Sequence, residues 1–226
     1  MIKNYLLLQI NDALFPIGAY SHSYGLETYI QKNLVYDEKT SAAFIKNYLY
    51  ESFCYSDLLT AKLCHEYAAS ENAEDILRIN ALVTASKTPY ELRNASKKLA
   101  SRFIKTVSLF ETEYETDIFE RCIKQSEDLN YAVVYGVFCA AAGIEFRAAA
   151  QNYIYAQTSA MATNCVKAIP LSQSAGQRIL FDTHKYFDEI IELVLKAGED
   201  ELCMGTPGFE LRSMQHEALY SRIYMS

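Results

Sequence analysis

Apolar residues recur at helical spacing along most of the chain. Ile45, Leu49 and Phe53 follow one another at intervals of four residues, which places them on one face of a helix. Comparable patterns, separated by polar or turn-forming residues, divide the sequence into successive helical segments. We therefore expect helices over residues 3–11, 21–32, 37–69, 76–88, 89–110, 116–124, 130–169 and 173–197.

Local signals predict several helix boundaries inside this pattern. Thr88, Pro89 and Glu91 match an N-cap, a first-turn proline and a capping-box glutamate, so a helix should begin there. A break is expected near Ser56. Gly143 should join two helices that are rich in alanine and tyrosine, because glycine tolerates the backbone of a tight connection.

The second and the last predicted helices carry end signals of their own. Ser21 is expected to cap the second helix, since its hydroxyl can accept a hydrogen bond from the first turn. Gly198 should follow the last long helix in the C′ position. His184 falls on the apolar stripe of that helix, where we expect a hydrogen-bonded histidine of the core.

The scarcity of turn residues favours an all-α fold. Only 8 of the 226 residues are glycine and 4 are proline, too few for the turns of an all-β protein. No linker or repeat divides the chain, so we predict a single-domain helical bundle over residues 1–226, with roughly eight to ten helices. Residues 199–226 include a Gly-Thr-Pro-Gly turn and are expected to form a mobile, partner-binding C-terminal tail.

Charge and hydropathy indicate the class of partner. A net charge of -7 opposes nucleic-acid binding, which depends on clustered Lys and Arg. The longest apolar run covers residues 132–144 and is too short to span a membrane, and no signal-peptide pattern opens the chain. We therefore expect a cytoplasmic protein with protein partners, whose six dispersed cysteines remain reduced.

Candidate metal and nucleophile patterns are weak. Cys64, His65 and Glu66 are consecutive on a helix and cannot converge on one ion, so Cys64 should pack inside and His65 should face water. The chain has no H-x-H, histidine-rich tail or cysteine pair for nickel, and no phosphate-binding loop of the G-x-x-x-x-G-K-[ST] type. We assign no catalytic residue, no metal site and no tightly bound cofactor.

Three segments together resemble the urease accessory protein UreF family. They read DALFPIGAYSHSYGLE at 12–27, PLSQSAGQR at 170–178 and HEALYSRI at 216–223. Their order and spacing also fit, so the resemblance extends over essentially the whole chain. Ala19 departs from the common pattern, in which a second glycine often follows Gly18.

The resemblance implies an all-helical cytoplasmic protein, usually a homodimer, without enzymatic activity of its own. Such a protein would join the accessory protein UreD, also called UreH, and the GTPase UreG in a complex that loads nickel into apo-urease. GTP hydrolysis would belong to UreG, and nickel would be handled only within the complex.

Candidate partner-binding residues lie in the three family-like segments. For each segment a structural role is also open: His22 can pack the N-terminal turn, residues 173–178 can cap and pack a helix, and the tail can dock on its own domain. Tyrosine and arginine are frequent at binding hot spots, which favours an interface role for the tail. The candidates are His22, Tyr24, Glu27, Gln173, Gln177, Arg178, His216, Glu217, Tyr220, Ser221 and Arg222.

Two other functions remain open from the sequence. One is a helical enzyme in which His22 or His216 works with Glu27 or Glu217 as acid and base. A deep pocket holding several of these residues with perturbed pKa values would favour it. The other is a generic helical adaptor with an unrelated partner.

Overall fold

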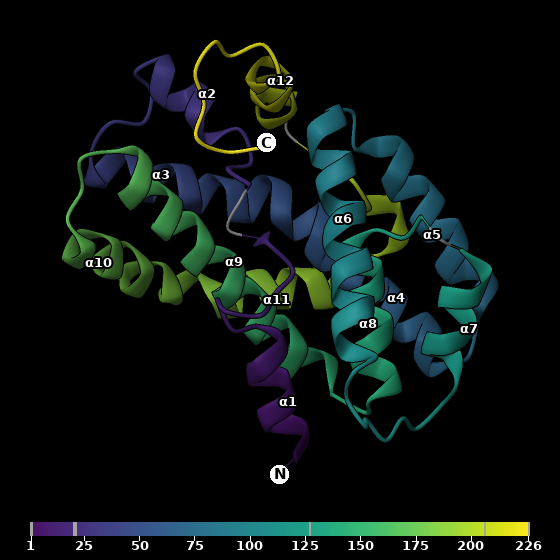
Figure 1. Ribbon diagram of the computed structural model, residues 1–226. Coiled ribbons are helices and arrows are strands. Elements are labelled where there is room, and N and C mark those ends of the chain that lie inside the picture. Colours follow the sequence, from purple (N-terminus) through teal and green to yellow (C-terminus); the bar gives the residue numbers. More distant parts are fainter. Residues whose placement is uncertain (1, 20–21, 127, 206, 226) are drawn as a thin grey trace.

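The periodic apolar positions fold into helices throughout the described chain. The computed structural model describes residues 2–19, 22–126, 128–205 and 207–225, and every regular element within these ranges is helical. Figure 1 shows the helices gathered into one body, with the C-terminal tail lying across its top. The predicted all-α, single-domain fold is confirmed.

The helices follow one another with short connections. Most of them match the ranges expected from the apolar pattern, including the two helices joined at Gly143, whose φ is 64°. The elements are α1 (Ile2–Ile10), α2 (Leu26–Gln31), α3 (Glu38–Tyr48), η2 (Leu49–Leu58), α4 (Leu59–Ala69), α5 (Ala73–Ser86), α6 (Tyr90–Val107), α7 (Ile118–Gln125), α8 (Tyr131–Ala141), α9 (Phe146–Ala168), α10 (Gln173–Thr183), η3 (His184–Tyr186), α11 (Phe187–Lys196), η4 (Glu199–Glu201) and α12 (Pro207–His216).

The long helical segment from α3 to α4 has no break at Ser56. Asp37 caps its start by accepting a hydrogen bond from the Thr40 amide at 2.8 Å, and the Thr40 hydroxyl completes a capping box. In the middle, η2 widens into a π-helix instead of interrupting the chain. Ser56 lies inside this stretch and donates its hydroxyl to the Ser52 carbonyl, so the expected break was wrong.

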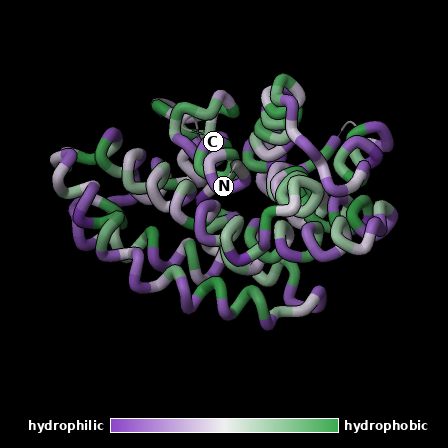
Figure 2. The backbone as a smooth tube through the Cα atoms, turned by 90° about the horizontal axis from the view of Figure 1, so that it is seen from below, coloured by the Kyte–Doolittle hydropathy of each residue, from purple (hydrophilic) through white to green (hydrophobic). Residues whose placement is uncertain are grey.

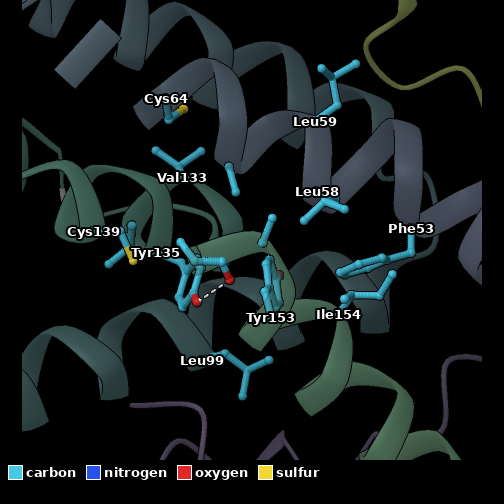
Figure 3. Close-up of a cluster of buried hydrophobic side chains, with 14 of the residues drawn as sticks. Phe53, Leu58, Leu59, Cys64, Leu99, Val133, Tyr135, Cys139, Tyr153 and Ile154 are labelled. Carbon is cyan, nitrogen blue, oxygen red and sulfur yellow. Dashed lines mark hydrogen bonds between the residues drawn. The ribbon is translucent and has the colours of Figure 1, made fainter. Parts of the chain in front are cut away.

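Helix α8 forms the centre of the core. Almost all its residues are buried, and it packs closely on α4, α6 and α9. A Cβ on Gly136 would overlap the Ala61 carbonyl oxygen, so glycine permits the close approach of α8 to α4. Figure 3 shows Tyr135 of α8 beside Tyr153 of α9, with ring centroids 4.7 Å apart. The Tyr135 hydroxyl donates to the Ala149 carbonyl at 2.9 Å, which satisfies this buried polar group.

The outer helices are amphipathic. Seen from below in Figure 2, hydrophilic and hydrophobic turns alternate along them, as expected for helices that bury one face. No helix in the described ranges has both the length and the hydrophobicity that a membrane crossing requires.

Several predicted helix ends were wrong. The second helix begins at Leu26, after a turn in which Tyr24 and Gly25 have φ values of 54° and 79°. Ser21, the predicted cap, lies outside the described residues. Helix α6 has Pro89 as its N-cap residue, and no capping box forms because proline has neither a polar side chain nor a backbone N–H. The Glu91 carboxylate binds the C-terminal tail instead.

The last long helix is also divided. The short 3₁₀ element η3 separates α10 from α11, and His184 in η3 is exposed rather than part of the core. Its ring lies against Phe181 and Phe187 on the surface, with centroids 5.8 and 5.3 Å away. Gly198 has an extended backbone with φ of -97°, so it is not a left-handed C′ residue.

The C-terminal tail is docked on the bundle rather than detached. Helix α12 packs against α2 and α6, and Figure 1 shows the chain returning over α2 after it. The Thr28 hydroxyl donates to the Arg212 carbonyl at 2.8 Å, and Gln31 donates to the Ser221 carbonyl at 3.0 Å. Of the two readings left open by the sequence, the structure has the docked one, and the mobility of the tail remains a prediction.

Candidate functional site

The N-terminal turn forms the base on which the tail rests. Gly25 adopts a left-handed backbone, and a Cβ there would lie 2.8 Å from the Ser213 hydroxyl oxygen. Helix α12 can therefore come close to the turn. The turn also starts α2 so that Glu27, in its first helical turn, is directed beneath the tail with only 7% of its surface exposed.

A buried histidine connects three distant parts of the chain. His216, at the end of α12, has no exposed surface. Its Nε2 lies 2.8 Å from Oε2 of Glu27, and its Nδ1 lies 2.9 Å from Oε2 of Glu91 on α6. Arg222 donates to the other oxygen of Glu91. We call Glu27, Glu91, His216 and Arg222 the tail cluster.

The Glu27 carboxylate also holds the last backbone segment. It accepts hydrogen bonds from the amides of Ile223 at 2.6 Å and Tyr224 at 3.0 Å. Burial raises the pKa of Tyr224 to about 12, so its phenol stays protonated and donates to the Asn164 carbonyl at 3.4 Å. The segment after α12 is therefore fixed by both backbone and side-chain bonds.

The two carboxylates of the tail cluster share their partners. Both ring nitrogens of His216 face carboxylate oxygens, one of Glu27 and one of Glu91. Arg222 adds a permanent positive charge next to Glu91, and a buried carboxylate requires such compensation. The cluster thus has the properties of an internal clamp between α2, α6 and the tail.

His22 packs inside the N-terminal turn. Only 5% of its surface is exposed, and its carbonyl accepts a hydrogen bond from the Asn164 amide at 2.8 Å. Burial, together with the nearby positive charges of Arg102 and Lys98, lowers the pKa of His22 to about 4. The imidazole is therefore neutral near pH 7, in line with the packing role left open by the sequence.

Tyr24 is half-buried beside the same turn. Its ring packs against Tyr48 with centroids 5.7 Å apart. Burial raises the pKa of its phenol, and the carboxylate of Asp57 raises it further. The side chain is thus a protonated phenol on the wall of the core, with part of its surface open to solvent.

The middle family-like segment lies on a different helix from the tail cluster. Ser172 caps α10 by accepting a hydrogen bond from the Ala175 amide at 3.1 Å. Arg178 makes a two-bond ion pair with Glu38, at 2.9 and 2.7 Å, and so joins α10 to α3. Gln173 and Gln177 are exposed on α10. The segment therefore caps and packs a helix, and its role in partner binding remains a prediction.

The tail presents its apolar side chains to solvent. Tyr220 is fully exposed, while Ile223 and Met225 are 71% and 59% exposed. Glu217 and Ser221 are exposed as well. His216 and Tyr224 are buried and anchor the tail, whereas most residues between them face outwards.

Sequence reasoning missed part of this site. Glu91 was assigned to a capping box, although it binds His216 and Arg222, because the local motif gave no sign of a partner 125 residues away. Ile223 belonged to a family-like segment but was not among the candidate partner-binding residues, although 71% of its surface is exposed. His216 and Glu27 were predicted to bind partners, but both are buried, so they can act on a partner only through the tail they hold.

A large cavity lies beside helix α12, but none of the four tail-cluster residues lines it. Its volume is about 650 Å³, and its wall includes Tyr24, Tyr48, Tyr131, Tyr153 and Tyr155. Within it, the Lys87 ammonium donates to the Asp57 carboxylate at 2.9 Å. None of the described residues proposed as acid or base, namely His22, Glu27, His216 and Glu217, lines it.

The Cys64–Glu66 segment does not form a ligand site. Cys64 is fully buried, as predicted, and burial raises the pKa of its thiol. His65 is half-buried rather than facing water, because its Nε2 lies 2.8 Å from the Ile144 carbonyl and its ring packs on Phe146. Within the described ranges, no three His, Cys, Asp or Glu side chains are placed to hold one metal ion.

Comparison with known families identifies the chain. A family model described as UreF matches residues 35–184, which is about two thirds of the sequence. The match runs from the start of α3 to η3, so it contains most of the buried core and the middle family-like segment. The two segments that meet in the tail cluster lie outside this range and resemble the family by their motifs. The chain belongs to the UreF family of urease accessory proteins.

Proposed function

We propose that this protein is a non-catalytic, cytoplasmic platform for urease maturation. A urease accessory role follows from family membership. The finer proposal is that the protein binds UreD, also called UreH, and positions the GTPase UreG so that nickel enters apo-urease. Its contribution is a shaped helical surface, while GTP hydrolysis belongs to UreG.

The docked tail is the observation that carries this proposal. Glu27 and Glu91 lose most of their contact with water when the tail docks, which costs free energy. Their contacts with His216 and Arg222 offset this cost. What this arrangement fixes in place is a short segment that exposes Tyr220, Ile223 and Met225. Exposed apolar side chains gathered on one ordered segment are typical of a protein-binding surface.

Residues can affect partner binding through the tail in two ways. Tyr220 and Ile223 would contact a partner directly, because their side chains are already outside the bundle. Glu27, Glu91 and His216 would matter indirectly, because without them the tail would lose its position. Arg222 has both properties, since it is partly exposed and pairs with Glu91.

The arrangement of the acid–base candidates supports a non-enzymatic role. Glu27 and His216 do come together, but each is satisfied by the other and by the tail backbone. His22 lies in the adjoining turn with its pKa lowered to about 4, so it would be a weak base at neutral pH. A catalytic pair needs a substrate within reach, and these buried side chains are covered by the tail.

Self-association is part of the proposal. Helix α1 exposes 66% of Tyr5 and 59% of Leu8, and α9, which contacts α1, exposes 47% of Tyr155. Leu8 and Tyr155 both line the mouth of the cavity, and with Tyr5 they offer exposed apolar surface on these two helices. We propose that this face pairs with a second copy to form the homodimer that the family resemblance implies.

The tail is tested by removing its exposed side chains. Tyr220→Ser combined with Ile223→Ser should weaken binding to purified UreD or UreG by about 1 to 3 kcal/mol, a loss typical of binding hot spots. Arg222→Ala and deletion of residues 213–226 should weaken it as well. The matched control is Leu82→Ser on α5, which also exchanges an exposed apolar side chain. Binding unchanged in all tail variants would reject the tail as an interface.

Nickel handling needs a separate test. We propose that nickel is carried by the partners and passes this protein only within the complex. Equilibrium dialysis of the isolated protein against nickel should give binding weaker than micromolar. A stoichiometric site of submicromolar affinity on the isolated chain would contradict this part of the proposal.

A further inference from the structure

Helix α6 concentrates positive charge in an acidic protein. Five of the 21 Lys and Arg residues lie within its 18 positions, although the chain as a whole has a net charge of -7. Only one acidic residue, Glu91, occurs in the helix, and it is bound to the tail. The remaining length of α6 therefore carries a local charge opposite to that of the protein.

Three of these cations share one side of the helix with an exposed leucine. Lys98, Arg102, Lys105 and Leu109 are separated by four, three and four residues, a spacing that keeps them on one face. The three cations are exposed, and Leu109, in the turn that ends α6, is 79% exposed. We call these four residues the α6 stripe.

Most of the charge on the α6 stripe is not paired with other side chains in the described part of the chain. By contrast, the other two cations of the helix are engaged: Arg93 donates to the Lys87 carbonyl at 2.9 Å, and Lys97 pairs with Asp128 at 2.8 Å. Lys98 and Lys105 make no hydrogen bond or ion pair with any described residue. This difference indicates that the stripe is free to meet charges from outside.

The N-terminal loop adds an apolar residue beside the α6 stripe. Arg102 donates to the Ile17 carbonyl at 3.1 Å, which fixes the loop against this half of the helix. Phe15 packs on Phe103 and anchors the same loop, with ring centroids 5.7 Å apart. Leu14, in the same loop and next to Phe15, is 91% exposed. A rigid backbone thus holds an exposed leucine next to the cations.

We infer that the α6 stripe, together with Leu14, is a docking surface for an acidic region of a protein partner that also presents an apolar side chain. The inference rests on the proposed function as an assembly platform and adds a second contact area to the tail. Opposite charge would steer the partner to the stripe and fix its orientation, while the leucines would supply apolar area.

Charge also argues against a nucleic acid as the occupant. Binding to phosphates gains affinity from many simultaneous contacts with Lys and Arg. The stripe offers three cations, and Arg102 already shares one donor with the loop. The rest of the chain is acidic and would repel a polyanion. An acidic protein surface of limited size fits this distribution of charge better.

The α6 stripe continues the surface formed by the tail. Glu91 precedes Lys98 by seven residues, so it lies on the same side of α6, two turns earlier. Because Glu91 binds Arg222, the tail covers the start of this side and the stripe follows it. This side of α6 extends about 27 Å from Glu91 to Leu109, at a helical rise of about 1.5 Å per residue. A single partner can therefore contact the tail and the stripe together.

The test is a double charge reversal with a matched control. The variant Lys98→Glu/Lys105→Glu and the control Lys185→Glu/Lys196→Glu change the net charge equally, and all four lysines are exposed. Each protein is titrated against purified UreD, UreG and apo-urease at 50 and 300 mM NaCl. We expect the stripe variant to bind at least one of them tenfold or more weakly at 50 mM, with a smaller difference at 300 mM. The control should stay within twofold of wild type.

The outcomes separate this inference from the proposed function. If wild type and stripe variant bind every component alike, the inference is overturned while the platform role stands. If wild type binds none of the three, the platform role falls, and the inference falls with it.

A mixed-sequence 20-nucleotide RNA is titrated in parallel. Loss of RNA binding in the stripe variant, with protein binding unchanged, would assign the stripe to nucleic acid and overturn the inference.

A leucine variant tests the apolar component independently of charge. Leu109→Ser leaves the cations in place and removes one exposed side chain. It should weaken binding of the same component about equally at both salt concentrations, because apolar burial is little screened by salt. Unchanged binding would overturn the assignment of Leu109 to the docking surface. Circular dichroism of all variants should match that of the wild type.

Discussion

Replacing His216 by alanine should release the C-terminal tail while the helical bundle stays folded. The imidazole has no exposed surface and lies between the carboxylates of Glu27 and Glu91. Its removal leaves both carboxylates facing a void without their shared donor. The tail packs on the outside of α2 and α6 and not in the core around α8, so we expect a local rather than a global effect.

The size of the effect follows from the geometry of the tail cluster. Removing one member of a buried, hydrogen-bonded charge group typically costs about 3 to 5 kcal/mol. The two hydrogen bonds to charged partners, at about 1.5 to 3 kcal/mol each, give a similar sum. At about 1.4 kcal/mol per factor of ten, the docked tail should become less populated by about a hundredfold to several thousandfold. The measured change cannot exceed the free energy by which the wild-type tail prefers the docked state.

Amide hydrogen exchange provides the assay. The amides of Ile223 and Tyr224 donate to the Glu27 carboxylate, so their protection reports whether the tail is docked. In His216→Ala both should exchange at least a hundredfold faster, or reach the unprotected rate. The control is His65→Ala, which removes another imidazole with a hydrogen bond but lies far from the tail in sequence and contacts the Ile144 carbonyl. This control should leave the exchange rates of the Ile223 and Tyr224 amides unchanged.

A second substitution identifies the physical cause. Combining His216→Ala with Glu27→Gln removes one of the uncompensated charges while keeping a carbonyl oxygen that can accept from the tail amides. Part of the lost protection should return. If the amides of Ile223 and Tyr224 in His216→Ala exchange within threefold of wild type, the cluster does not hold the tail and the reasoning is refuted.

Three further predictions concern the core, the pH dependence and self-association. Gly136→Ala should lower the free energy of unfolding by about 1 to 3 kcal/mol in urea titrations, because the added methyl meets the α4 backbone, whereas Gly208→Ala, which meets nothing, should not. The pKa of His22 is about 4 when folded and 6.5 when unfolded, so the unfolded chain binds the proton first. Wild type should therefore lose stability as the pH falls from 6.5 to 4, and His22→Gln should flatten this part of the profile. Light scattering should give twice 25.7 kDa at micromolar concentration. Leu8→Ser should shift this mass toward the monomer, and a monomeric wild type would contradict the proposed dimer face.

The sequence by itself determined the helices and most of their order. Helix formation depends on side chains three and four positions apart, so the apolar period of α3, α4, α8 and α9 was readable directly. Gly143 marked the connection between α8 and α9 because its left-handed backbone suits glycine. The same local reasoning failed at η2, where the helix widens instead of breaking at Ser56. It also failed at η3, where His184 turns outwards.

Only the tertiary structure decided which polar residues form a site. The sequence singled out Glu27, His216 and Arg222 within family-like segments. It paired His216 with Glu27 only as one option for an enzyme, and it gave no partner for Arg222. Glu91 looked like a helix cap, since a capping box is a contact between near neighbours. In the folded chain its carboxylate binds His216 and Arg222, 125 and 131 residues away. Local periodicity predicts helices, whereas a buried charge requires an opposite charge from wherever the packing of those helices brings one.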